Sequence, residues 1–155
     1  MQEKMELVSI GVIRSPYLNR GDAPRQGRLE NTVSEIHIFD PYKAGVGEPG
    51  SCSHIFVLYW LDRARRDLLT ATPPGTGRER PVFSTRSPNR PNPIGIGIAT
   101  VKEVRNGVIT VAGLDALDGT PVLDIKPYSP AIDCIPDATN EFDSELHIKK
   151  SNLTG

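Results

Sequence analysis

Glycine and proline interrupt this chain so frequently that they limit its fold class before any motif is considered. The 155 residues include 14 glycines and 14 prolines. Proline removes a backbone donor and restricts the residue before it, and glycine weakens helix and strand interiors alike. This pattern argues against a helical bundle and favours short strands that are joined by shaped loops.

The segments between these interruptions have the character of strands. The most apolar of them, HIFVLYWL at 54–61, is too short for a typical helix and predicts a buried central strand. Asn106-Gly107 lies between VKEV and VITV, which indicates a hairpin with a type I′ turn. Further strands are expected in the opening MELVSIGVI, at 34–39, at 94–104 and at 122–125.

These segments together predict an all-β fold, a closed or nearly closed β-barrel of about six to seven strands with long loops and few short helices. A short helical turn is expected after Asp40-Pro41, and TATPPGTG at 70–77 indicates a mobile surface loop. No repeat or linker divides the sequence, so we expect one domain over 1–155. Its motif-bearing core covers about 8–130, and 137–155 forms a peripheral tail.

Several classes of protein leave no signal in this sequence. No segment approaches the ~20 apolar residues of a membrane helix, and the N-terminus lacks a signal-peptide pattern, so a soluble cytoplasmic protein is expected. Cys52 and Cys134 have neither disulfide-framework nor zinc-site spacing. His37, His54 and His147 also lack metal-ligand spacing, so no metal is expected. Neither a Rossmann nor a P-loop signature is present.

Two loops are rich in planar hydrogen-bond donors. In Pro24-Arg25-Gln26-Gly27, the Arg and Gln donors lie between a proline, which restricts the backbone, and a glycine, which leaves it free. An ordinary solvated turn would have the same sequence features. The segment 83–95, FSTRSPNRPNPIG, is more unusual, because its three prolines exclude a helix or a strand interior. It predicts a rigid, extended loop in which Arg86 and Arg90 are fixed donors for a carboxylate or a phosphate.

A third polar segment, 115–128, is a turn that leads into a short strand. Asp124 and Lys126 are two residues apart, so in a strand both point to the same face. One interpretation is a surface ion pair that contributes little to stability. The other is a site that binds a zwitterion or a ribose through a carboxylate, an ammonium group and backbone amides.

Four motifs together, PRQG, Ser53-His54, TRSPNRPNPIG and LDGTPVLDIKPY, resemble those of the tRNA adenine-37 N6-methyltransferase family. The resemblance extends from Ile10 to about Pro130. It implies a β-barrel homodimer that binds S-adenosylmethionine (SAM) near the subunit interface. It also implies methyl transfer to N6 of an adenosine of tRNA that already bears a threonylcarbamoyl group. Some bacterial relatives carry an added C-terminal domain.

The resemblance also implies which residues contact SAM. The charges of SAM suggest individual roles: Asp118 or Asp124 would hold its ammonium or ribose, and Arg25 or Arg86 its carboxylate. We hypothesise that Asp124 or Tyr128 accepts the N–H of the adenine amine. The contacts at Leu117–Thr120 have an alternative placement at 123–126. The implied SAM contacts are Pro24, Arg25, Gln26, His54, Ile55, Arg86, Ile96, Leu117, Asp118, Gly119 and Thr120.

Five further arginines are candidates for phosphate contacts, with a solvated charged face as the alternative: Arg63, Arg65, Arg66, Arg78 and Arg80. Binding to RNA through them would weaken steeply with salt. Two other functions use the same features. One is a SAM-dependent methyltransferase of a small molecule or another nucleotide, whose substrate binding would not depend on salt. The other is a non-catalytic RNA-binding barrel, although aromatic residues make up only 6% of the chain and Phe56, Tyr59 and Trp60 lie in a strand expected to be buried.

Overall fold

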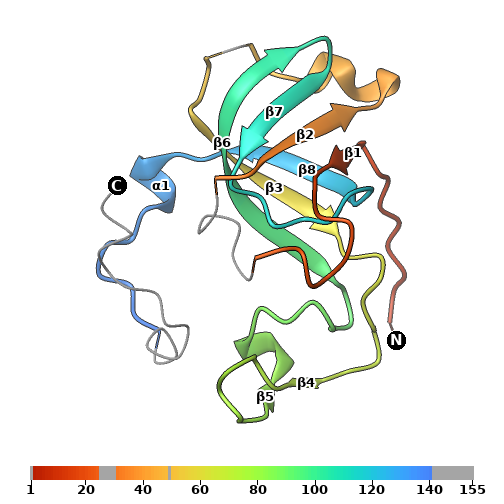
Figure 1. The fold of residues 1–155 in the computed structure, drawn as a ribbon, viewed down its shortest axis with the longest axis vertical. Helices are drawn as coiled ribbons and strands as arrows, with labels where there is room; N and C mark the ends of the chain where they lie inside the picture. The colour runs from red at the N-terminus through yellow and green to blue at the C-terminus, as the bar shows by residue number, and fades with distance from the viewer. Residues whose placement is uncertain (1, 25–30, 49, 141–155) are drawn as a thin grey trace. The chain divides into compact units, whose positions relative to one another are not determined.

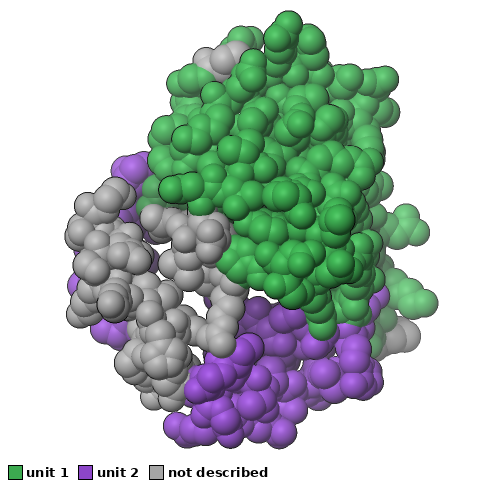
Figure 2. Space-filling view, viewed as in Figure 1, with its two compact units in different colours: residues 1–64, 93–128 green, residues 65–92, 129–155 purple. Residues whose placement is uncertain are grey.

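The computed structural model of this chain describes residues 2–24, 31–48 and 50–140. The chain divides into two compact units, which Figure 2 shows in different colours. The first consists of residues 1–64 and 93–128, and the second of residues 65–92 and 129–155. The expectation of one domain over 1–155 stays a prediction.

The first unit is a closed barrel of six antiparallel strands (Figure 1). Each strand pairs with its two neighbours, and the last in the order pairs back with the first. The closed β-barrel expected from the sequence is therefore confirmed. The order around the barrel is β1 (Gly11–Arg14), β2 (Val33–Ile38), β7 (Val108–Ala112), β6 (Ile94–Arg105), β3 (His54–Trp60) and β8 (Pro121–Pro127).

The hairpin between β6 and β7 has the expected turn. Arg105 pairs with Val108, and the two residues between them have positive φ, 50° at Asn106 and 77° at Gly107. Those signs are what a type I′ turn requires, and glycine adopts them without steric cost. The short helical turn after Asp40 is also confirmed, as the 3-10 helix η2 (Asp40–Gly45), with a proline in its first turn.

The first strand is shorter than the sequence predicted. β1 begins only at Gly11, where pairing with Ile38 of β2 begins, and the described residues before it form no regular element. Met5 and Leu7 are 85% and 61% exposed. The prediction was wrong for this part because apolar residues form a strand only where a partner strand is available.

The barrel interior holds the hydrophobic core, and two glycines of β6 make room for it. A Cβ atom at Gly95 would overlap the ring of Tyr59, and one at Gly97 would lie 2.9 Å from Leu114 Cδ2. The Tyr59 hydroxyl then donates a hydrogen bond of 2.5 Å to Asp115 Oδ1. The buried core consists of Ile13, Ile36, Ile38, Ile55, Val57, Tyr59, Ala99, Ile109, Val111, Leu114, Ala116 and Val122.

The second unit has little regular structure among its described residues. A two-stranded sheet joins β4 (Thr70–Ala71) to β5 (Arg80–Pro81), followed by the 3-10 helix η3 (Val82–Ser84) and later by α1 (Pro130–Asp133). The loop expected at 70–77 therefore begins as a strand. Across the described residues, no helix has the length and apolar character needed to cross a membrane.

Candidate functional site

Three connections leave the barrel at the same end. β1, β3 and β7 run in the same direction, because one antiparallel strand separates each from the next around the barrel. Their last residues, Arg14, Trp60 and Ala112, define what we call the loop end. The opposite end, marked by Asn106-Gly107, is the hairpin end. In sequence, all three motif loops fall within the connections that start at the loop end.

The loop Leu117–Thr120 is a tight turn at the loop end. The Thr120 N–H donates to the Leu117 carbonyl at 3.2 Å, and the Thr120 hydroxyl donates to the same oxygen at 2.7 Å. Gly119 has φ of +84°, a conformation that favours glycine. The sequence LDGT thus forms a tight turn, and the positive φ at its third residue, Gly119, favours glycine there.

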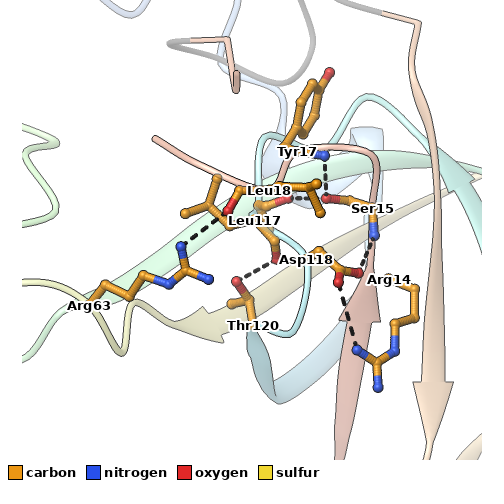
Figure 3. A network of polar contacts seen from close by, with 9 residues as sticks. Arg14, Ser15, Tyr17, Leu18, Arg63, Leu117, Asp118 and Thr120 are labelled. Atoms are coloured by element: carbon orange, nitrogen blue, oxygen red, sulfur yellow. Dashed lines mark hydrogen bonds and ion pairs between the residues drawn. The ribbon is translucent and has the colours of Figure 1, made fainter. Parts of the chain in front are cut away.

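A second turn, Arg14 to Tyr17, holds this loop in place (Figure 3). The Ser15 N–H donates to Asp118 Oδ1 at 3.1 Å, and the Ser15 hydroxyl donates to the Ala116 carbonyl at 2.8 Å. Arg14 Nη1 lies 3.8 Å from Asp118 Oδ2. In return, the Asp118 N–H donates to the Tyr17 carbonyl at 2.8 Å. The loop is therefore fixed by contacts to the end of β1.

These contacts correct one expectation about the loop. The N–H groups of Asp118, Gly119 and Thr120 all donate within the chain, to the carbonyls of Tyr17, Ile13 and Leu117 respectively. They are not available as the amide donors that the sequence suggested for a zwitterion or a ribose. Ser15 was not recognised as part of the site from the sequence. Its signal was a Ser-Pro turn that directly follows a strand and lies at the loop end.

Strand β8 brings a second set of predicted residues together. Lys126 Nζ lies 3.1 Å from Asp124 Oδ2, which confirms that the two side chains share a face of β8. Asp124 Oδ1 also accepts the Ile125 N–H at 2.9 Å. The side chains of Asp124 and Lys126 are 48% and 64% exposed. Their charges therefore remain accessible to a ligand.

Tyr128, the residue after β8, lies next to His54, the first residue of β3. The Tyr128 N–H donates to the His54 carbonyl at 3.0 Å, and the two rings meet edge to face with centroids 6.5 Å apart. The Phe56 ring lies 5.5 Å from that of Tyr128. His54 Nδ1 is 2.8 Å from the Ser53 hydroxyl. A phenol and an imidazole thus lie at the hairpin end, on the strand pair that carries Asp124.

The residues implied as SAM contacts do not converge within one barrel. His54 begins β3 at the hairpin end, whereas Leu117–Thr120 lies at the loop end. The strand from Thr120 to Tyr128 separates them by roughly 25 Å, at about 3.3 Å per residue. Ile55 is 5% exposed and lies in the core, while Ile96 is 45% exposed on the outer face. Pro24 is described, and Arg25 and Gln26 lie outside the described residues.

Residues 83–92 of the proline-containing segment 83–95 belong to the second unit, and arginine side chains hold them. Arg66 Nε donates to the Pro91 carbonyl at 2.8 Å. Arg90 Nη1 donates to the carbonyls of Thr85 and Ser87 at 3.0 and 3.1 Å. Arg90 is thus used inside the loop, where the sequence suggested a donor for a ligand. Arg86 is exposed on the same loop.

The other arginines suggested as phosphate contacts differ in their accessibility. Arg80 is only 6% exposed, which makes it unsuitable for contact with RNA. Arg63 donates to the Leu18 carbonyl at 3.2 Å (Figure 3). Arg65 pairs with Asp67 at 2.7 Å, and this hydrogen bond lowers the pKa of Asp67 and raises the pKa of Arg65. Arg78 is exposed.

No group of three or more His, Cys, Asp or Glu side chains that could hold a metal occurs within residues 2–24, 31–48 and 50–140. The candidate residues described above offer carboxylates, guanidinium groups, an ammonium group, a phenol and an imidazole. Those groups suit SAM, which carries a carboxylate and an ammonium group and therefore needs both signs of charge.

Known proteins resemble this chain over most of its length. A family model described as the tRNA-methyltransferase O N-terminal domain matches residues 12–134. An S-adenosyl-L-methionine-binding protein of Archaeoglobus fulgidus is 54% identical over 131 residues, which cover 84% of this chain and 94% of that protein. The tRNA (adenine(37)-N6)-methyltransferase of Escherichia coli is 40% identical over 144 residues, which cover 86% of this chain and 61% of that enzyme.

Solved structures agree with these relationships. A crystal structure of TrmO from Pseudomonas aeruginosa matches with a TM-score of 0.77 at 30% identity, over 91% of this chain and 63% of that one. The chain thus spans less than two thirds of the Escherichia coli and Pseudomonas proteins. The barrel, the motif loops and these matches together show that the chain belongs to the tRNA-methyltransferase O family of SAM-binding methyltransferases.

Proposed function

We propose that this protein transfers a methyl group from SAM to N6 of threonylcarbamoyladenosine at position 37 of tRNA, in the cytoplasm. The observation that carries the proposal is the group formed by Asp124, Lys126 and Tyr128 next to His54. It presents a carboxylate, an ammonium group, a phenol and an imidazole on one strand pair. The name of the Escherichia coli relative supplies the reaction and the tRNA position.

Asp124 and Tyr128 are the proposed catalytic residues. When bound, SAM would supply a methyl group on a sulfonium, whose S–C bond breaks to release a neutral thioether, a good leaving group. N6 is a poor nucleophile, because its lone pair is delocalised into the ring and into the carbonyl of the threonylcarbamoyl group. An acceptor such as Asp124 or the Tyr128 hydroxyl would hold the N–H of this amine and favour a pyramidal nitrogen. In well-oriented systems, alignment of the two reacting groups lowers the activation free energy by about 7–11 kcal/mol.

For SAM itself, we propose the contacts that the family resemblance implies. Arg25 or Arg86 would hold its carboxylate, while Asp118 or Asp124 would hold its ammonium or ribose. Asp118 Oδ1 already accepts the Ser15 N–H, but each carboxylate oxygen has two lone pairs. The proposed set is Pro24, Arg25, Gln26, His54, Ile55, Arg86, Ile96 and Leu117–Thr120.

We propose that two copies of the barrel form the site, with SAM near their interface. A homodimer would explain why the proposed contacts lie at both ends of one barrel. The outer faces of β3 and β6 supply an apolar surface, because Leu58 pairs with Ile96, and Trp60 with Ile94. Ile94 and Ile96 are 40% and 45% exposed. Exposed apolar rows of this kind are typical of protein interfaces.

The proposal is tested by calorimetric titration of the protein with SAM. We expect saturable binding in the original chain and a strong loss of affinity in Arg86→Ala. Arg105→Ala, an exposed arginine at the hairpin end, is the matched control and should bind normally. Absence of SAM binding, with and without tRNA, would refute the proposal and favour an RNA-binding barrel.

A further inference from the structure

The hairpin end of the barrel contains a cavity of about 610 Å³. It lies within the first unit, and the connection from β2 to β3, which carries η2, forms one of its walls. Its apolar lining includes Ile38, Val46, Ile55, Val104, Ile109 and Ile125. A cavity of this size and lining is typical of a site for a small organic group, and barrel mouths are frequent places for such sites.

The polar groups of the cavity define the charge of its ligand. Asp124, Glu48, Ser51 and Cys52 contribute to the lining, and none of the described lining residues is Arg or Lys. Asp124 is paired with Lys126, which lies outside the lining, and Glu48 adds a second carboxylate, so the lining itself disfavours a phosphate or a carboxylate inside the cavity. They favour an uncharged or cationic group that offers N–H donors. Tyr42 adds an aromatic ring to the wall, which suits a flat partner.

We propose that this cavity takes the acceptor nucleobase, a purine turned out of its RNA strand, with its exocyclic amine at Asp124. The inference rests on the proposed function and extends it by assigning the substrate base to the cavity. Enzymes that modify a base generally extrude it from the stack into a fitted pocket. An adenine base is flat and uncharged, and its exocyclic N–H is a donor for the Asp124 carboxylate, while its phosphates stay outside.

Lys126 is then a specificity residue for the threonylcarbamoyl group. It does not line the cavity, but its Nζ lies 3.1 Å from Asp124 Oδ2 and its side chain is 64% exposed. The substituent on N6 ends in a threonine carboxylate. With N6 at Asp124, Lys126 lies on the solvent side, where that carboxylate would meet an ammonium group.

The first test uses Cys52 as a probe of the cavity. It is half-buried in the lining, and the second cysteine, Cys134, is exposed and can be replaced in a Cys134→Ser background. The rate of alkylation of Cys52 by N-ethylmaleimide is measured with an anticodon stem-loop that carries threonylcarbamoyladenosine. With RNA at about ten times its dissociation constant, labelling should slow about tenfold, because only free protein reacts.

A stem-loop that is abasic at the same position is the matched control. It retains the backbone charges but cannot fill the cavity, so Cys52 should react at nearly its free rate. Equal protection by both RNAs would overturn the assignment of the base to the cavity. Protection by SAM alone would assign the cavity to the cofactor and would overturn the proposal as well.

A second test blocks the cavity. Val46→Trp places a large ring in the lining, whereas Val33→Trp makes the same change at an exposed position of β2 outside the cavity. We expect Val46→Trp to lose methyl transfer while its affinity for SAM stays unchanged, and Val33→Trp to retain both. Full methyl transfer by a folded Val46→Trp protein would overturn the proposal.

These outcomes are distinguishable from failure of the proposed function. If the chain neither binds SAM nor methylates RNA, the proposed function fails, and calorimetry alone shows it. The cavity proposal fails separately if methylation occurs while Cys52 remains equally reactive with the base-containing RNA.

Discussion

Leu117–Thr120 and Asp124–Tyr128 lie only a few residues apart in the chain, yet the structure holds them in opposite ways. The first is fixed by its backbone, since the N–H groups of Asp118, Gly119 and Thr120 are all donated within the chain. The second presents side chains from an open strand face, where Asp124 is 48% exposed. The loop end is built as a rigid frame, and the hairpin end offers reactive groups.

This difference separates two requirements of group transfer. A frame that is fixed before binding lowers the entropy cost of holding a cofactor. The acceptor side needs accessible charges that meet a substrate and respond to it. Changes at the loop end should therefore alter the affinity for SAM. Changes at the strand face should alter the rate of the chemical step.

The largest effect is expected from Asp124→Asn. The substitution keeps the shape of the side chain but weakens its ability to accept the N–H of the amine. Turnover should fall roughly 10²–10⁴-fold, as for the loss of a positioned base. Affinity for SAM should stay unchanged if Asp118 holds the ammonium or ribose, and should fall as well if Asp124 holds it. Single-turnover assays of methyl transfer measure this fall in rate. Asp67→Asn removes another exposed, ion-paired carboxylate and is the control. Full turnover in Asp124→Asn would refute its role.

Gly95→Ala should destabilise the barrel itself. The new Cβ would overlap the ring of Tyr59, whose hydroxyl anchors Asp115 before the loop. Overpacking of this kind typically costs about 1–3 kcal/mol of the free energy of unfolding. Urea denaturation measures the change. Gly45→Ala, at a position with no atoms near the added Cβ, should leave stability almost unaltered. Equal stability of the two variants would contradict the packing account.

A smaller effect is expected from Ser15→Ala, which loosens the frame at the loop end. The variant loses the hydrogen bond from the Ser15 hydroxyl to the Ala116 carbonyl, and the longer one that this hydroxyl accepts from the Tyr17 N–H. One such bond contributes about 0.5–1.5 kcal/mol, so affinity for SAM should fall by up to roughly tenfold. The rate at saturating SAM should hardly change. Ser9→Ala removes a similar bond to the Gly11 carbonyl and is the control. A loss of rate without a loss of affinity would break the comparison.

The smallest effect concerns RNA binding. Arg78 is exposed, whereas Arg65 is already paired with Asp67. If both face RNA, Arg78→Gln should reduce the slope of log affinity against log salt by about 1, and Arg65→Gln by less. Fluorescence anisotropy with labelled tRNA at several salt concentrations measures both slopes. A larger change for Arg65 would show that its pair with Asp67 opens on binding.

Much of the barrel was predictable because its signals are local. The hairpin at Asn106-Gly107 needs positive φ at both residues, and the sequence offers them. The central strand at 54–60 is set by its own apolar residues. The strand at 5–10 was wrongly predicted because its apolar character is real, but pairing with β2 begins only at Gly11.

The site was less predictable because it depends on contacts between distant parts of the chain. The bond from Ser15 to Asp118 joins residues more than a hundred positions apart, and no local pattern indicates it. The use of Arg90 inside its own loop was equally hidden. The pairing of Asp124 with Lys126 was predictable, since it follows from the alternation of side chains along one strand.

The central claim is methyl transfer to N6 of threonylcarbamoyladenosine, and nucleoside mass spectrometry tests it most directly. tRNA that carries the modification is incubated with the protein and SAM, digested and analysed. The account predicts that the threonylcarbamoyladenosine signal is replaced by a species heavier by one methyl group, and that Asp124→Asn greatly slows this change. An unchanged nucleoside profile with protein that binds both SAM and tRNA would contradict the account.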